Sequence, residues 1–188
     1  MTQENTHHDV SANTIFGFWI YLMTDFILFA TLFATYAVLR NNVPQDLFTL
    51  SFSLYETLVL LTSCFSCGMA MVAAARQDKN RTITWFVVTL FLGLSFLAMV
   101  GEELASQIAA GNTWQKSAFL SSYFTLVGTH WLHVFFAVLF IIVFTLQVFR
   151  RGFTEAVTRR LTCLSLFWFF SYLVWIFMFT FVYLIGVL

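Results

Sequence analysis

Two histidines three residues apart, His130 and His133, stand in the otherwise almost wholly apolar run of residues 123–136. Imidazole is a common metal ligand and also binds haem iron. On a helix, residues i and i+3 share one face and lie about 4.5 Å apart along the axis, whereas two axial ligands must reach one haem from opposite faces. The other two histidines lie in the first eight residues. We therefore do not expect this chain to hold a bis-histidine haem.

A zinc or copper site would need one or two further ligands from another helix to complete the histidine pair. Glu56 or Glu103 could supply one, but no metal-binding spacing links either glutamate to the histidines. We favour the alternative in which His130 and His133 hydrogen-bond to neighbouring helices or to a partner chain.

The elements that carry these residues are predicted by composition. Of the 188 residues, 60% are hydrophobic and only 10% are charged, against about 25% charged in soluble domains. Most of the chain is therefore expected to lie in lipid, where the backbone must pair within helices. Helices that cross a bilayer need about 20 apolar residues, and five stretches are long enough: residues 15–39, 52–75, 82–101, 123–149 and 161–187.

The predicted fold class is all-α, a polytopic membrane bundle of five helices. Residues 1–14 form a polar tail and residues 15–188 a single transmembrane domain. The longest connection, residues 102–122, begins with "EELASQIAAG", which predicts that the third helix continues beyond the membrane and ends near Gly111. Trp114 and Tyr123 are expected at the outer membrane interface.

Four carboxyl groups lie in or beside the apolar stretches. Asp25 is ten residues into the first stretch, about 15 Å deep and near the bilayer midplane. Glu56 could bond to His130 or lie beside lipid headgroups, and Glu103 stands with Glu102 at an outer helix end. Carboxyl groups at such depth either bond to a neighbouring helix or belong to a proton relay. We favour the structural role for Asp25 and leave both readings open for Glu56.

Basic residues gather in two of the four loops. The loops after the second and fourth stretches hold seven of them, while the other two loops hold only Arg40 and Lys116. Because basic loops face the cytoplasm, we predict a cytoplasmic amino terminus and a periplasmic carboxyl terminus. Such clusters also attract anionic lipid, and the candidates for headgroup binding are Arg76, Arg150, Arg151, Arg159 and Arg160. A net charge of zero gives no reason to expect a nucleic-acid partner.

Four segments together resemble subunit III of the haem-copper oxidases: "IFGFWIYLMTDFILFATLFATYAVL", "YFTLVGTHWLHV", "RRG" and "CLSLFWFF…VWIFMFTFVYLIG". The resemblance covers residues 14–188. It is greatest to the five-helix form of bacterial bo-type ubiquinol oxidases.

The resemblance implies a non-catalytic membrane subunit of a proton-pumping quinol oxidase in the bacterial inner membrane. It implies partner subunits I, II and IV, with haem and copper in subunit I and none in this chain. It also implies phospholipid held in a cleft between the helices, and a stabilising role toward subunit I. Asp25, Glu103, His130 and His133 match polar positions of the family whose role is structural.

The sequence departs from the family motifs at three positions. Trp131 replaces the glycine of G-x-H-G-L-H-V, which implies repacking around this ring. In "WFFSYLVW", Phe169 and Tyr172 stand where the family has a histidine and an aspartate, so two positions expected to be buried and polar are aromatic. A proton relay through the last helix is therefore not expected.

Two alternatives stand beside this interpretation. A subunit-III-like protein of nitric oxide reductases has a similar size and helix number. A small transporter would show repeats or helices broken by Gly or Pro, whereas the single proline, Pro44, lies outside every predicted helix.

Within the predicted subunit, the small residues Ala30, Ala34, Gly68 and Gly128 are expected to shape grooves for lipid or a partner. Asp25→Ala or His130→Ala is expected to weaken assembly before turnover.

Overall fold

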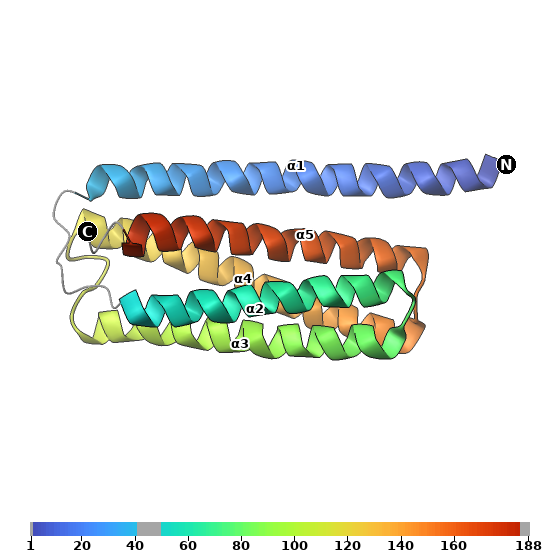
Figure 1. Cartoon of the computed structure of the whole chain (residues 1–188). Helices are drawn as coiled ribbons and strands as arrows, with labels where there is room; N and C mark the ends of the chain where they lie inside the picture. Colours follow the sequence, from blue (N-terminus) through green and yellow to red (C-terminus); the bar gives the residue numbers. More distant parts are fainter. Residues whose placement is uncertain (1, 41–49, 185–188) are drawn as a thin grey trace.

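The computed structural model describes residues 2–40 and 50–184. This part of the chain is helical throughout, apart from short turns (Figure 1). The α-helices are α1 (Thr2–Leu39), α2 (Leu50–Ala75), α3 (Lys79–Ala109), α4 (Ala118–Arg151) and α5 (Glu155–Met178), and α5 runs on into a π-helical segment, η2 (Phe179–Leu184).

Helices α2 to α5 pack side by side as a four-helix bundle, with α2 against α3 and α5, and α4 against the same two helices. Helix α1, the top helix of Figure 1, lies outside this bundle and packs mainly along α4 and α5. All five helices are long and apolar enough to span a membrane. The prediction of an all-α bundle of five membrane-spanning helices is thus confirmed.

The observed helices are longer than the predicted spans. Helix α1 begins at Thr2, so the polar segment predicted as a tail continues the first helix, apart from Met1, which lies outside the described residues. Helix α3 runs to Ala109, eight residues past the predicted span, and Gly111 follows with φ of +80°. The helical reading of "EELASQIAAG" and its stop near Gly111 are therefore confirmed. The last predicted residues of the fifth span, 185–187, lie outside the described part.

Polar caps set the start of the helices that follow tight turns. The Ser117 hydroxyl accepts a hydrogen bond from the Phe119 amide at the start of α4, and the Thr154 hydroxyl accepts one from Val157 at the start of α5. The turn between these helices contains Gly152 with φ of +67°, a region that glycine enters without strain. The sharp reversal brings the basic residues at the two helix ends together.

The inward face of α1 is a stripe at helical spacing. Leu22, Asp25, Phe29 and Tyr36 are all buried, although most of residues 13–39 are exposed. Phe29 contacts the rings of His130 and His133 on α4. The stripe thus places the carboxyl group of Asp25 in an otherwise apolar contact between α1 and its neighbours. Asp25 is the first residue of the candidate site.

Candidate functional site

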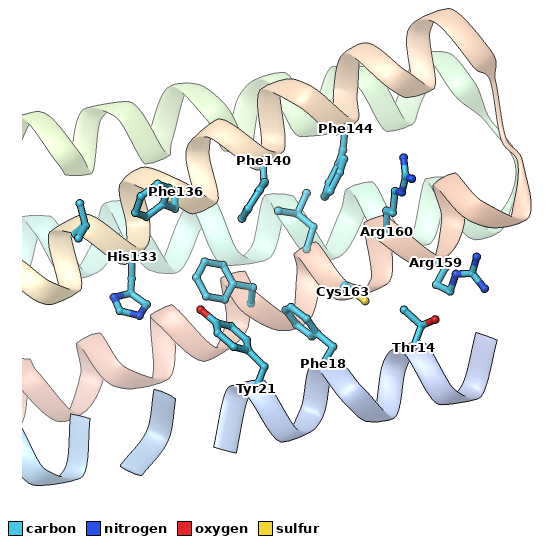
Figure 2. Close-up of a pocket in the computed structure, with 13 residues that line it drawn as sticks. Thr14, Phe18, Tyr21, His133, Phe136, Phe140, Phe144, Arg159, Arg160 and Cys163 are labelled. Carbon is cyan, nitrogen blue, oxygen red and sulfur yellow. The ribbon is translucent and has the colours of Figure 1, made fainter. Parts of the chain in front are cut away.

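A cleft opens between α1, α4 and α5 at the end where α1 begins. Its volume is about 830 Å³, and its walls are mainly aromatic. Figure 2 shows Phe18 and Tyr21 rising into it from α1, with His133 descending from α4. The remaining lining residues are Thr14, Leu132, Phe136, Phe140, Phe144, Arg159, Arg160, Cys163, Leu164 and Phe167. The cleft is thus an apolar channel with cationic side chains at one end and a polar pair at the other.

The polar pair joins α4 to α1. The Nε2 atom of His133 lies 3.5 Å from Oδ2 of Asp25, and both side chains are largely buried. Tyr21, one helical turn before Asp25, turns its side chain toward the same cleft. The prediction that His133 bonds to a neighbouring helix is consistent with this approach, which is close enough for an ion pair and long for a hydrogen bond.

The hydrogen-bond pattern of His133 fixes one proton position. Its Nδ1 lies 2.8 Å from the Thr129 carbonyl oxygen, one turn earlier in α4. A carbonyl oxygen can only accept, so Nδ1 carries a hydrogen and Nε2 is the acceptor of a neutral ring. Attraction between Nε2 and Asp25 therefore requires one further proton, held either by the carboxyl group or by the imidazole.

A second polar cluster lies near the opposite end of the bundle and ties together three helical segments. The Tyr183 hydroxyl of η2 donates to Oε2 of Glu103 at 2.9 Å, and the Tyr123 hydroxyl of α4 donates to Oε1 at 3.2 Å. The two phenol oxygens are 3.4 Å apart. Glu103 thus bonds α3 to both neighbours, while Glu102 beside it is exposed.

Tyr123 and Tyr183 are fully buried, so the Tyr123 ring faces other helices of this chain, and its depth at the membrane interface stays a prediction. Trp114 is half-exposed, as an interfacial residue would be. Tyrosine beside an acidic residue is no motif in sequence, and the pairing depends on the π-helical turn that carries Tyr183. Nothing in the sequence pattern indicated that turn.

Glu56 on α2 lies inside the bundle, fully buried, and neither of its carboxyl oxygens has a hydrogen-bond partner among the described residues. It lies near enough to Glu103 for the two carboxyl groups to interact electrostatically. Both expectations for its surroundings, a bond to His130 or a place beside headgroups, were wrong. The next residue, Thr57, instead accepts a hydrogen bond from the Trp175 indole at 3.1 Å.

His130 is packed as an aromatic ring. It is fully buried, stacks on Trp175 with ring centroids 5.4 Å apart, and has Phe29 and Phe96 at its edges. Neither ring nitrogen has a hydrogen-bond partner among the described residues. His130 thus makes no hydrogen bond to a neighbouring helix among the described residues, and the alternative of a bond to a partner chain stays a prediction. Over residues 2–40 and 50–184, no three His, Cys, Asp or Glu side chains are grouped to hold a metal ion.

The three departures from the family motifs lie on two helices, Trp131 on α4 and Phe169 and Tyr172 on α5. The Trp131 indole donates to the Leu97 carbonyl on α3 at 3.0 Å and covers Gly101. Phe169 is 41% exposed, against the expectation of a buried position, and Tyr172 is partly buried. Trp131 thus adds a bond between α3 and α4, and Phe169 faces outward.

The candidate headgroup residues lie at one end of the bundle. The turn between α2 and α3 and the turn between α4 and α5 are together at the right of Figure 1, where α1 also begins. Arg159 and Arg160 reach the cleft, whereas Arg76 lines neither of the cavities at this end. Arg150 and Arg151 close α4, where positive charge is favourable.

Five helices long and apolar enough to span a membrane define a multi-pass membrane protein. Comparison with known families gives the narrower class. The profile described as "Cytochrome c oxidase subunit III" matches residues 2–187. The chain belongs to the subunit III family of the haem-copper oxidases.

Individual relatives agree with this assignment. The chain is 47% identical over 186 residues to the cytochrome bo(3) ubiquinol oxidase subunit 3 of Pseudomonas aeruginosa, covering 96% of this chain and 89% of the relative. The corresponding protein of Pseudomonas putida is 45% identical, with 96% and 90% covered. The quinol oxidase subunit 3 of Bacillus spizizenii is 38% identical, with 92% and 87% covered.

Proposed function

We propose that this chain is the third subunit of a haem-copper quinol oxidase, a membrane subunit without a redox centre of its own. The observation that carries the proposal is similarity along almost the whole chain to proteins named as subunit 3 of such oxidases. Electron transfer and oxygen reduction belong to a partner chain with haem and copper. This chain contributes membrane surface and internal bracing.

The role of the polar clusters is to hold the five helices in one arrangement against the partner. In lipid, helix association depends on close packing and on buried polar bonds, since apolar surface alone gains nothing. The Glu103 cluster joins α3, α4 and η2, and the Asp25–His133 pair joins α1 to α4. We infer that subunit I docks on a surface that these bonds keep in shape, with subunits II and IV in the same complex.

We infer the orientation from the basic loops, because their seven Arg and Lys residues favour the cytoplasmic side of a bacterial inner membrane for that end. The cleft opens at the same end, with Arg159 and Arg160 at its mouth and aromatic rings along its walls. We infer that it holds a phospholipid, with the phosphate at the arginines and an acyl chain along the rings.

The test is affinity purification through a tag on this chain from membranes of cells that express the whole complex. The expected result is co-purification of a haem-bearing subunit with quinol oxidase activity, together with phospholipid retained in detergent. The chain expressed alone should show no haem absorbance. A lone chain that retains stoichiometric haem or copper, or a tagged chain recovered with no haem protein, would overturn the proposal.

A further inference from the structure

Glu56 is a carboxyl group inside the bundle that the bonds between helices do not use. Its side chain is fully buried, and neither of its oxygens has a hydrogen-bond partner among the described residues. It lies near the start of α2, at the end of the bundle where η2 also lies (Figure 1). Within the described part of the chain, Glu56 therefore braces no contact between helices by hydrogen bonding.

The surroundings of Glu56 offer no positive charge to compensate a carboxylate. Among the described residues, the titratable groups that interact with it electrostatically are Glu103 on α3, Tyr123 on α4 and Tyr183 on η2. Residues 41–49 and 185–188, which lie outside the described part, contain no Arg, Lys or His. Helix α1 begins at the opposite end of the bundle (Figure 1). A negative charge on Glu56 would thus lack a cationic partner among these groups.

Glu103 is the neighbouring carboxyl group, and its hydrogen bonds suit an anion. Each of its two oxygens accepts a hydrogen bond from a different phenol, at 2.9 Å from Tyr183 and at 3.2 Å from Tyr123. Hydrogen bonds to an ionised acceptor are stronger than those to a neutral one, so two donors favour the charged form of Glu103. Glu56 receives no such donor. The two carboxyl groups are therefore prepared for different charges.

The pair requires a proton, and the contacts decide which member holds it. Two carboxylates that interact inside a protein repel each other, so one of them retains a proton. An ionised carboxyl group without hydrogen-bond donors is far more costly to bury than the neutral acid. We propose that Glu56 and Glu103 form a proton-binding site near one end of the bundle, with one exchangeable proton on Glu56 and the negative charge on Glu103.

Glu103 also connects this site to its surroundings. Its side chain is only partly buried, and the residue before it, Glu102, is exposed, whereas Glu56 is enclosed. On loading, a proton first binds the Glu103 carboxylate and then passes to Glu56, which restores the charge on Glu103 and its bonds to the phenols. Carboxyl groups in series carry protons in this way in membrane proteins. The inference goes beyond the proposed function, because neither bracing nor binding of a partner needs a proton here.

The experiment is infrared spectroscopy of the intact oxidase complex at neutral pH, purified through a tag on this chain and transferred from ordinary to heavy water. The C=O stretch of a protonated carboxyl group moves to lower frequency when deuterium replaces its proton, and a carboxylate has no such band. Subtraction of the Glu56→Gln exchange spectrum from the wild-type spectrum should leave one band of this kind. The band should lie at the high-frequency end of the range, because the Glu56 carbonyl accepts no hydrogen bond. Glu103→Gln should retain a band of a protonated acid, since Glu103 does not hold the proton.

The matched control is Glu102→Gln, which removes the exposed carboxyl group next to Glu103 and should leave the band in place. Retention of the band in Glu56→Gln, or its loss in Glu103→Gln, would overturn the proposal. A wild-type band that emerges only after treatment with the chelator EDTA would also overturn it, because a metal cation would then hold the two carboxylates.

Assembly of the variants gives a second readout. Glutamine has nearly the shape of a neutral glutamic acid, so Glu56→Gln should assemble in the same yield as wild type. Loss of assembly in Glu56→Gln but not in Glu102→Gln would show that Glu56 is held as an anion, and would contradict the proposal. Recovery of a haem-bearing complex with the tagged wild-type chain tests the proposed function separately, whatever the spectra show.

Discussion

His133 on α4 and Asp25 on α1 approach each other to 3.5 Å at the inner end of the cleft. Helix α1 packs mainly on α4 and α5, and this pair is a polar contact between α1 and α4. The contact is placed by the inward stripe of α1, which brings Asp25 and Phe29 to the same ring. We infer that the pair fixes the position of α1 and thereby the width of the cleft.

Replacing Asp25 with Asn should loosen α1 from the bundle. The amide keeps the shape but has neither the charge nor the acidic proton through which Asp25 attracts His133, and we expect the complex to be destabilised by about 1–3 kcal/mol. The measurement is thermal unfolding of the detergent-solubilised complex, with quinol oxidase turnover followed in parallel. His133→Gln should destabilise it by a similar amount, and the double variant by less than the sum because the residues act on each other.

Thr24→Val is the control for this pair, since the Thr24 hydroxyl bonds only to the Ile20 carbonyl of its own helix. It should change neither unfolding nor turnover. An Asp25→Asn complex of wild-type stability without initial turnover would contradict the structural role and favour direct proton transfer.

Removal of a donor from the Glu103 cluster should destabilise the bundle. Tyr183→Phe and Tyr123→Phe each leave one Glu103 oxygen without its phenol partner inside the protein, at a cost of about 1–3 kcal/mol. Tyr55→Phe is the matched control, because Tyr55 is 64% exposed. The measurement is the unfolding midpoint of the complex and the fraction of this chain that remains bound after mild detergent washing. Equal behaviour of Tyr183→Phe and Tyr55→Phe would show that the cluster does not stabilise the bundle.

The fold followed from the sequence because lipid leaves few choices. Apolar stretches of spanning length must be helices, and loop charges divide the two ends. The sites were harder to predict. The positions of Asp25, Glu56 and His130 within the apolar stretches predicted that they are buried in the membrane. Which side chain each of them contacts depends on how the five helices pack, and a single sequence does not show that. His133 lies beside Asp25, while His130 stacks on Trp175.

Residues without a pattern were missed for the same reason. Tyr183 enters the core through a π-helical turn, and the residue type of Tyr123 did not indicate that its hydroxyl would donate to Glu103. The small residues expected to shape grooves include Gly128, which has nothing within 4 Å of an added Cβ. Gly93, which stands in no recognisable motif, is instead the glycine against which α4 and α5 pack most closely.

Glu56 should tolerate an apolar replacement better than a buried carboxyl usually does. Its two oxygens have no hydrogen-bond partner among the described residues, so Glu56→Met removes an uncompensated polar group while keeping much of the volume. We expect the complex to be unchanged or more stable, since such swaps are often neutral or stabilising. The measurement is the unfolding midpoint together with turnover at several pH values. A stable complex that turns over slowly would assign Glu56 a functional proton, and a large fall in stability would show that the carboxyl group has a partner.

Gly93 on α3 should be intolerant of any side chain. A Cβ at this position would lie 2.8 Å from the Trp168 ring of α5 and 3.2 Å from Val138 of α4, both of which are buried. Gly93→Ala therefore forces three helices apart, and we expect it to destabilise the complex by about 1–3 kcal/mol through overpacking. Gly128→Ala is the control, because an added methyl there meets nothing and removes the backbone freedom of glycine. The unfolding temperature of the assembled complex should be lower than wild type for Gly93→Ala, and equal to or higher than wild type for Gly128→Ala. If Gly93→Ala unfolds at the wild-type temperature, α3 does not pack as closely against Trp168 of α5 as the structure describes.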